Sequence, residues 1–256
     1  MRPRILAVAN QKGGVGKTTT AISLGATLAA YERPTLIVDL DPQSNSTSGL
    51  GVVVGAEQDT TYQLLTGEAA AAAAVVPTSF PHLAMIPTTP DLAGAEIELV
   101  GMVGREFRLR DALQPLEGFS FVLVDCPPSL GLLTLNALAA ADALLIPIQC
   151  EYFALEGVSE LMRTVDEVRR FLNPGLAIDG VLLTMYDERT NLARQVADEV
   201  RGVFGDLVFE TVVPRNVRLA EAPSFGQPIQ AYDLRSRGAE AYLLLGREYL
   251  ERMEVA

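Results

Sequence analysis

The amino-acid sequence predicts an α/β protein with a mostly parallel, twisted sheet that is covered by helices on both faces. Short apolar runs rich in β-branched residues recur along the chain, and the stretches between them have helical spacing. Nearly continuous apolar strands that alternate with helices are typical of parallel sheets buried on both faces. The chain has 256 residues, 49% of them hydrophobic, which is enough to bury such a core in a single domain spanning residues 1–256.

Seven segments are predicted to be strands. They are ILAVA from residue 5, TLIVDL from 35, LAMIP from 83, FVLVD from 121, ALLIPI from 143, GVLLTM from 180 and LVFETVVP from 207. Residues 68–77 are predicted to form a short helix that ends at a proline. A later stripe with helical spacing is interpreted as a core-facing side and consists of Val158, Leu161, Met162, Val165, Val168 and Leu172.

The composition limits the possible partners and compartment. The net charge of -12 opposes any partner that needs a broadly basic surface, so DNA binding must be local. Cys126 and Cys150 lack the spacing of a metal site and are expected to be buried free thiols in a reducing cytosol. No export signal or membrane span is expected, because the first apolar run is short and residues 132–148 are interrupted by polar side chains. His82, the only histidine, is expected in a surface loop.

The stretch QKGGVGKTTT, residues 11–20, follows the first predicted strand and opens a predicted helix. Glycines in such a loop let backbone N–H groups approach phosphate oxygens, and the helix N-terminus adds favourable partial positive charge. Lys17 is expected to bridge the β- and γ-phosphates, and Thr18 is expected to offer its hydroxyl to Mg²⁺. The residues predicted to bind the nucleotide here are Lys12, Gly13, Gly14, Val15, Gly16, Lys17, Thr18 and Thr19. The usual pattern has a glycine where Gln11 stands, and Lys12 is surplus within one subunit.

Carboxylates follow two other predicted strands. Asp125 ends FVLVD and is expected to hold Mg²⁺, while Asp39 and Asp41 end the run from residue 35. Because parallel strands present their carboxyl ends at one edge, these groups are expected to face the same crevice as the glycine loop. Asp41 is a candidate for positioning the attacking water. The metal set is thus predicted to be Thr18, Asp41 and Asp125.

Several longer blocks carry a resemblance that covers almost the whole chain. They are KGGVGKTTT, VDLDPQSNSTSGLG, DCPPSLGLLTLNAL, CEYFALEG, LLTMYDERTN and VPRNVRLAEAPSFGQPI. Together they resemble the ParA/Soj chromosome-partitioning ATPases, which belong to the deviant Walker A group of P-loop NTPases that also includes MinD. The resemblance implies an ATPase that uses ATP and Mg²⁺, is slow alone, and is located in the cytoplasm on the nucleoid.

The same resemblance implies roles for single residues. Lys12 would be the signature lysine that reaches the partner subunit's phosphates in an ATP-sandwich homodimer, which accounts for the second lysine. Asp41 would be required for hydrolysis, and Asp39 would support the Mg²⁺ environment and the mobile switch segment expected at residues 39–49. The residues implied beside the adenine are Met185, Pro214 and Asn216.

The resemblance also implies partners. Arg189 in YDERTN and Arg218 in PRNVRLAEAPS match DNA-contacting arginines, so non-specific binding of double-stranded DNA is expected, with Arg215, Arg235 and Arg237 as weaker candidates. A ParB-type centromere-binding protein with a basic segment is expected to stimulate hydrolysis. The loop starts about ten residues into the chain, so the N-terminal helix-turn-helix domain of larger relatives is expected to be absent.

Three other classes of protein are alternatives to this interpretation. A MinD-like membrane ATPase would need a basic amphipathic C-terminal helix, whereas this chain ends LLLGREYLERMEVA, and no membrane partner is expected. An iron-sulfur carrier would need cluster cysteines that Cys126 and Cys150 do not supply. A metabolic kinase or ligase is not excluded by the loop itself, but it gives no account of the NVRLAEAPS block.

Overall fold

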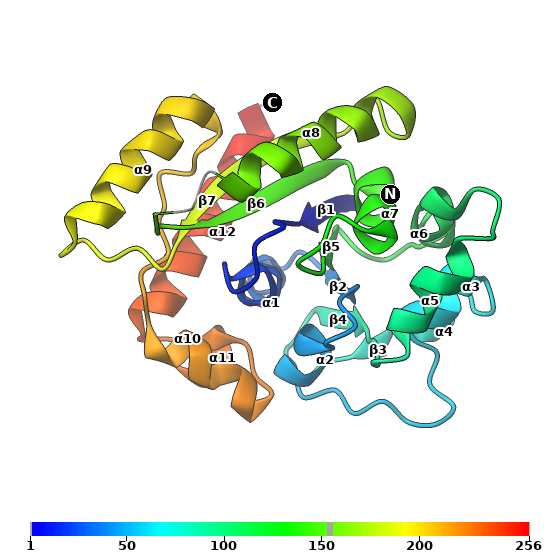
Figure 1. Cartoon of the computed structure of the whole chain (residues 1–256). Coiled ribbons are helices and arrows are strands. Elements are labelled where there is room, and N and C mark those ends of the chain that lie inside the picture. The colour runs from blue at the N-terminus through cyan, green and yellow to red at the C-terminus, as the bar shows by residue number, and fades with distance from the viewer. Residues whose placement is uncertain (1, 153–155, 256) are drawn as a thin grey trace.

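The computed structural model describes residues 2–152 and 156–255. Its described part contains one sheet with the strand order β3-β4-β2-β5-β1-β6-β7 (Figure 1). The strands are β1 (Arg4–Val8), β2 (Thr35–Asp39), β3 (Val76–Pro77), β4 (Leu83–Ile86), β5 (Phe121–Asp125), β6 (Ala143–Gln149) and β7 (Ala177–Thr184). All neighbouring pairs in this sheet are parallel except β3 and β4. The predicted fold class is confirmed.

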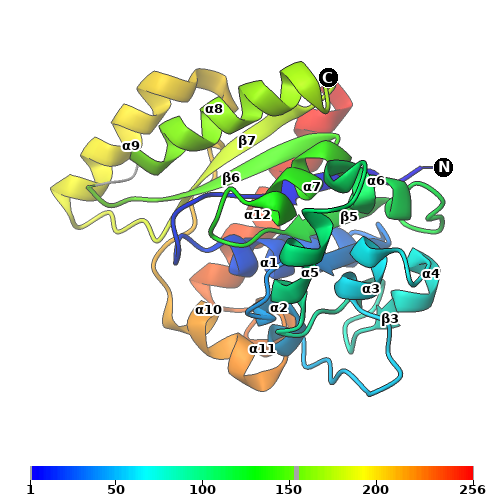
Figure 2. The same cartoon turned by 45° about the vertical axis from the view of Figure 1, so that its right-hand side comes forward.

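Helices cover both faces of the sheet (Figures 1 and 2). One face packs against α3 (Thr61–Thr66), α4 (Ala71–Ala74), α5 (Leu92–Leu99), α6 (Arg108–Leu113), α7 (Leu132–Ala140), α8 (Glu156–Phe171) and α9 (Asn191–Phe204). The other face packs against α1 (Lys17–Ala30), α10 (Val217–Glu221), α11 (Ile229–Tyr232) and α12 (Arg237–Val255). The short helix α2 (Asn45–Gly49) follows β2, and the 3₁₀ turns are η1 (Arg105–Phe107), η2 (Gly205–Leu207) and η3 (Ala222–Phe225).

The strands divide their side chains between two apolar cores. Along β1, Ile5 and Ala7 join the core under α7, whereas Leu6 and Val8 join the core under α1. Successive side chains of a strand point to opposite faces, so a strand between two helical layers must be apolar at every position. This requirement explains the unbroken apolar runs in the sequence.

The prediction of a strand at residues 207–214 is wrong. The segment begins in η2 and makes only two isolated parallel bridges to the β7 region, Val181 with Val208 and Tyr186 with Pro214. Between these bridges, the backbone N–H groups of Glu210 and Thr211 donate to the Glu248 carboxylate of α12 at 2.8 and 2.9 Å. A side chain on α12 therefore satisfies the backbone groups that a continuous strand would have paired.

Several smaller predictions can be compared with the described residues. The alanine-rich segment forms only α4, and Pro77 lies in the edge strand β3, where a missing N–H group is tolerated. The stripe on α8 faces the core, as predicted. Cys126 and Cys150 are buried free thiols, and His82 is exposed, both as predicted.

Residues 153–155 of the CEYFALEG block lie outside the described residues. Among the helices described, none is long and apolar enough to cross a membrane.

Candidate nucleotide site

The glycine loop connects β1 to α1 at the carboxyl edge of the sheet. The buried Asn10 side chain holds its start, since the amide donates to the Pro147 carbonyl at 2.7 Å and its oxygen accepts from the Lys12 N–H at 3.0 Å. Gly14 and Gly16 have positive φ values of 73° and 90°, which L-residues with side chains rarely adopt. No side chain caps the start of α1 at Gly16, so the N–H groups of its first turn remain available to an anion.

The two lysines of the loop occupy different environments. Lys17 is 6% exposed, and its ammonium donates to the Lys12 carbonyl at 3.1 Å. Burial lowers the pKa of Lys17, and the nearby Asp125 charge opposes that shift. The side chain of Lys12 is 33% exposed, and its Nζ lies 4.0 Å from Glu151 Oε2. Lys17 is therefore held inside the site, whereas Lys12 lies at its rim.

Three carboxylates meet beside this loop. Asp39 and Asp125 are register partners at the ends of adjacent strands β2 and β5, and both are fully buried. Burial is the first cause that raises the pKa of each, and their proximity raises the pKa of Asp125 further. Asp41 is 6% exposed, and its Oδ1 accepts from the Gln43 N–H at 2.9 Å. Two buried carboxylates side by side favour a cation that compensates their charge.

Helix α2 forms hydrogen bonds to two of these carboxylates. The Ser46 hydroxyl donates to Asp125 Oδ2 at 2.7 Å, and the Thr47 hydroxyl and N–H donate to Asp39 Oδ2 at 2.7 and 2.8 Å. Neither hydroxyl is among the site residues predicted from the sequence, although SNST shortly after a strand-end carboxylate is the kind of segment that can supply such donors. The start of α2 is therefore positioned by the site.

The residues present fit Mg²⁺. The Oδ1 atom of Asp125 is buried and has no hydrogen-bond partner within the described residues, and the Thr18 side chain lies close enough to lower the pKa of Asp125. In the part of the chain described, no three His, Cys, Asp or Glu side chains are arranged to hold a metal by themselves. Mg²⁺ bound with nucleotide usually takes one or two protein ligands and completes its shell with phosphates and water.

A second cavity, of about 340 Å³, opens beside the loop. It brings the three predicted adenine-pocket residues together with the loop, and its lining includes Gly16, Thr19, Met185, Pro214, Asn216 and Tyr242. The sequence analysis did not find Thr184, whose hydroxyl donates to the Val15 carbonyl at 2.8 Å, or Tyr242, which bonds Thr20 through its hydroxyl at 3.0 Å. Both residues reach the site through tertiary packing. Thr184 had one local signal, because it is a polar residue at the end of a predicted strand, directly before Met185.

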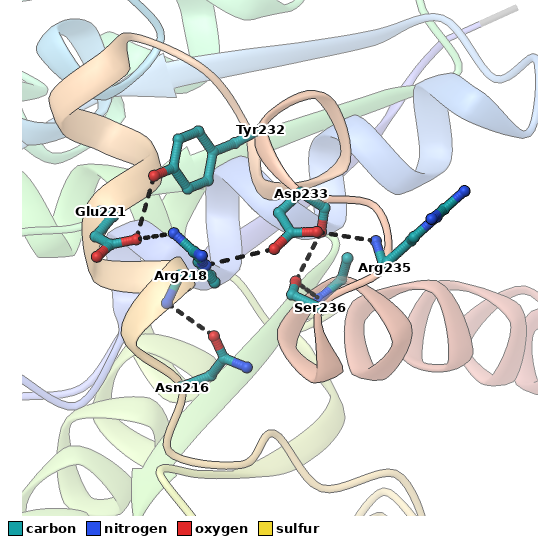
Figure 3. Close-up of polar contacts among 8 residues, drawn as sticks. Asn216, Arg218, Glu221, Tyr232, Asp233, Arg235 and Ser236 are labelled. Atoms are coloured by element: carbon teal, nitrogen blue, oxygen red, sulfur yellow. Dashed lines mark hydrogen bonds and ion pairs between the residues drawn. The ribbon is translucent and has the colours of Figure 1, made fainter.

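The two predicted DNA-contacting arginines lie outside this site, on an exposed surface. Arg189 makes a bidentate ion pair with Asp187 at 2.8 and 2.7 Å, which lowers the pKa of that carboxyl to about 2. Arg218, on α10, pairs with Glu221 at 2.8 Å and with Asp233 at 3.5 Å (Figure 3). A surface groove of about 760 Å³ is lined by Arg189, Arg215 and Arg237, and also by Val217 next to Arg218.

Known proteins are similar to this chain in both sequence and fold. A family model described as an AAA domain matches residues 3–178. The chain is 58% identical over 250 residues to the chromosome partitioning protein ParA of Myxococcus xanthus, covering 97% of this chain and 88% of that protein. It is 54% identical over 246 residues to the sporulation initiation inhibitor protein Soj of Bacillus subtilis, covering 96% and 97%.

Solved structures support the same assignment. Cobyrinic acid a,c-diamide synthase from Mycobacterium smegmatis, with bound ADP and magnesium, superposes with a TM-score of 0.86 at 40% identity, covering 98% of this chain and 96% of that one. A second structure of that protein holds an ATP analogue and magnesium. MinD from Pyrococcus horikoshii, complexed with Mg-ADP, gives a TM-score of 0.77 at 26% identity, covering 96% and 95%. ATP and Mg²⁺ are therefore confirmed as the predicted cofactors.

The sheet, the glycine loop and the strand-end carboxylates define the class as a P-loop ATPase. Within this class, the 58% identity to a protein named for chromosome partitioning exceeds the 40% identity to the synthase. The chain belongs to the ParA/Soj family of chromosome-partitioning ATPases. The metabolic enzymes that the loop alone left open are thereby disfavoured.

Proposed function

We propose that this partitioning ATPase forms an ATP-sandwich homodimer, that the dimer binds double-stranded DNA without sequence preference, and that hydrolysis releases it. The observation that carries the proposal is the setting of the two lysines in one loop. Lys12 and Lys17 are the only lysines in the chain. Lys17 is buried against the carboxylates, whereas Lys12 lies at the rim with one ion-pair contact at 4.0 Å.

The chemistry follows from this arrangement. Two polyphosphates facing each other across a dimer repel strongly where water is scarce, and a cation contributed from each side offsets that repulsion. Lys12 makes this contribution to the partner subunit, while Lys17 binds the β- and γ-phosphates of its own subunit. Thr18, Asp41 and Asp125 would hold Mg²⁺, which would neutralise charge on the phosphates. Asp41 orients the attacking water, and Asp39 holds Thr47 of the switch segment.

The adenine lies in the cavity that contains Met185, Pro214 and Asn216. Its location next to Gly16 and Thr19 supports this assignment, because a base must lie within one nucleotide length of the phosphate loop. Residues 1–256 act as one P-loop domain, which works in the cytoplasm on the nucleoid.

The proposed protein partner is a ParB-type centromere-binding protein. Hydrolysis is slow alone and is stimulated when the partner and DNA are bound. A surface with a net charge of -12 attracts a basic segment of such a partner. Adding a Lys/Arg-rich partner peptide at saturation should raise the rate of ATP hydrolysis, and an unchanged rate contradicts this part of the proposal.

No membrane partner is proposed. The apolar residues Tyr242, Leu245 and Tyr249 of α12 are buried against the sheet, so this side of the helix is already covered. On the rest of the helix, four charged residues form the ion pairs Arg247–Glu251 and Arg252–Glu248 at 2.8 and 2.7 Å, and Leu244 is the exposed large apolar residue. A basic amphipathic membrane anchor requires a free apolar face and a cationic one.

The two lysines provide a direct test. Lys17→Ala should lose tight binding of a fluorescent ATP analogue, whereas Lys12→Ala should bind the analogue but remain monomeric by light scattering. In the wild-type protein, an amine-reactive reagent should modify Lys12 without nucleotide, and ATP should protect it as the dimer forms. A dimer that still forms with ATP in Lys12→Ala contradicts the cross-subunit role.

A further inference from the structure

Two glycines from distant parts of the chain meet backbone to backbone. Gly51 follows α2, and Gly226 follows η3, and their φ values are +68° and +64°. A Cβ atom placed on Gly226 would lie 2.7 Å from the Cα of Gly51, and one on Gly51 would lie 3.1 Å from the Gly226 carbonyl oxygen. Only two residues without side chains allow this approach. We call the contact of Gly51 with Gly226 the glycine seam.

On the Gly51 side of the seam, α2 connects the contact to the nucleotide site. Helix α2 has only five residues, and its start is fixed by the bonds from Ser46 to Asp125 and from Thr47 to Asp39. Its end packs on η3, because a Cβ on Gly49 would lie 3.5 Å from Pro223 Cβ. One short helix therefore joins the two carboxylates to Gly51.

On the Gly226 side of the seam, η3 connects the contact to α10, which carries Arg218. Gly226 ends η3, with its N–H donating to the Pro223 carbonyl at 3.0 Å, and η3 continues directly from α10, which carries Arg218. Figure 2 shows α2 beside the orange segment around α11, and α2 packs on η3 within this segment. Figure 3 shows Arg218 between Glu221 of α10 and Asp233, which follows α11. The position of η3 thus bears on how Arg218 is presented.

We propose that the glycine seam couples the nucleotide state of the carboxylate site to the DNA affinity of the surface around Arg218. The inference rests on the proposed function, since it assumes that ATP strengthens DNA binding. Side chains that meet can change rotamer and absorb a small displacement, but two backbones in contact cannot. Close-packed elements instead transmit such displacements as discrete rearrangements. The seam is therefore a rigid contact between the segment that senses the phosphates and the segment that presents the arginine.

The test measures coupling rather than activity. The affinity for a labelled duplex is measured by fluorescence anisotropy with and without a non-hydrolysable ATP analogue, and the ratio of the two dissociation constants is the coupling factor. Gly226→Ala should bind the analogue and dimerise as the wild-type protein does, while its coupling factor falls by at least about fivefold. Dimerisation is followed by light scattering, and folding by circular dichroism.

Gly104→Ala is the matched control. Gly104 has φ +68°, close to that of Gly226, but a Cβ there meets nothing within 4 Å. This variant carries the same kind of backbone strain without closing a contact, so its coupling factor should equal that of the wild type. If Gly226→Ala does not fold, Gly51→Ala decides the question in the same assay, because its added Cβ is opposed by a carbonyl oxygen at 3.1 Å.

Each failure has its own signature. A wild-type protein whose DNA affinity is the same with and without the analogue overturns the proposed function. A wild-type gain that survives intact in a folded seam variant overturns the seam alone. The seam is also overturned if Gly226→Ala loses analogue binding, since the contact then supports the nucleotide site rather than its link to DNA.

Discussion

Lys12 and Lys17 carry the only two side-chain ammonium groups of the chain, and apart from His82 every other basic side chain is an arginine. The distinction matters at the scale of one residue. An ammonium is a compact charge with three rotatable donors, and it fits between a glycine loop and phosphate oxygens. A guanidinium is a planar fork that suits bidentate pairing on a surface, as between Arg189 and Asp187. The chain therefore uses each cation where its geometry suits the expected anion.

Asp41→Ala is predicted to separate binding from hydrolysis. Asp41 lies beside the buried Asp39 and Asp125 but is not the residue that anchors α2. The variant should bind ATP and accumulate as a dimer, while its hydrolysis rate falls by at least about 100-fold. Phosphate release and light scattering measure the two properties. Hydrolysis at the wild-type rate contradicts a water-positioning role for this carboxylate.

Thr47→Val is predicted to destabilise the protein without changing its fold. The Thr47 hydroxyl donates to the buried Asp39 and accepts from the Thr88 N–H at 3.0 Å. Valine keeps the shape but leaves both buried groups short of a partner, which costs about 2 kcal/mol of unfolding free energy. Urea unfolding measures the loss. Ser48→Ala, an exposed position on the same helix, should change the unfolding free energy by less than about 0.5 kcal/mol, and equal losses in both variants contradict the argument.

At the scale of the element, the sequence predicted six of the strands because each must be apolar on both faces. The seventh predicted run, residues 207–214, is equally apolar, but the carboxylate of Glu248 takes up the N–H groups in its middle. Glu248 lies on α12, far away in the sequence, so no pattern within residues 207–214 could predict that it would bind these N–H groups. The two-residue strand β3 is too short to have a periodicity.

In the site too, residues with a local sequence signal were predictable, whereas residues brought in by tertiary packing were not. The loop and the strand-end aspartates were predictable, because the carboxyl ends of parallel strands converge at one edge. The cavity that joins Met185, Pro214 and Asn216 agrees with the grouping that the family resemblance implied. Thr184 and Tyr242 could not be predicted, since their roles depend on how β7 and α12 pack on the loop.

Asp187→Asn is predicted to strengthen DNA binding. The carboxylate of Asp187 holds the Arg189 guanidinium, and its pKa of about 2 keeps it charged across the physiological range. An exposed ion pair is weak, so DNA phosphate competes with it at modest cost. Removing the charge should raise the affinity of the ATP-bound protein for DNA roughly two- to fivefold. Asp198→Asn, an exposed change of equal charge on α9, is the control, and weaker binding by Asp187→Asn means that Asp187 orients the arginine instead.

At the scale of the whole molecule, a net charge of -12 must be reconciled with the proposed binding to DNA, a polyanion. Repulsion between like charges is long-ranged but screened within about 10 Å at 0.1 M salt, whereas direct contacts to phosphate act at the surface. A monomer offers only a few such contacts. A dimer presents two copies of the arginines on one ligand, so the second set binds at a high effective concentration. In the proposed function, an ATP-dependent dimer with an acidic surface would therefore make DNA binding conditional on nucleotide.

The double variant Arg189→Ala, Arg218→Ala tests this account. It should dimerise with ATP as the wild type does but lose most of its DNA affinity. Phosphate contacts carry no sequence information, so the wild-type dimer should bind unrelated duplexes equally well. Each phosphate contact contributes about -0.9 to the slope of log affinity against log salt concentration. Removing two arginines from each of two subunits should therefore make that slope shallower by roughly 3 to 4.

Arg163→Ala, Arg170→Ala provides the matched control for that measurement. Both arginines are exposed on α8, which lies across the sheet from α10, and their loss makes the protein more acidic by the same amount (Figure 1). If net charge alone governed DNA binding, the two double variants would weaken it equally. Local contacts predict that the α8 variant keeps nearly the wild-type salt slope. Unchanged affinity in the Arg189 and Arg218 variant, or equal binding with and without ATP, contradicts a nucleotide-gated arginine surface.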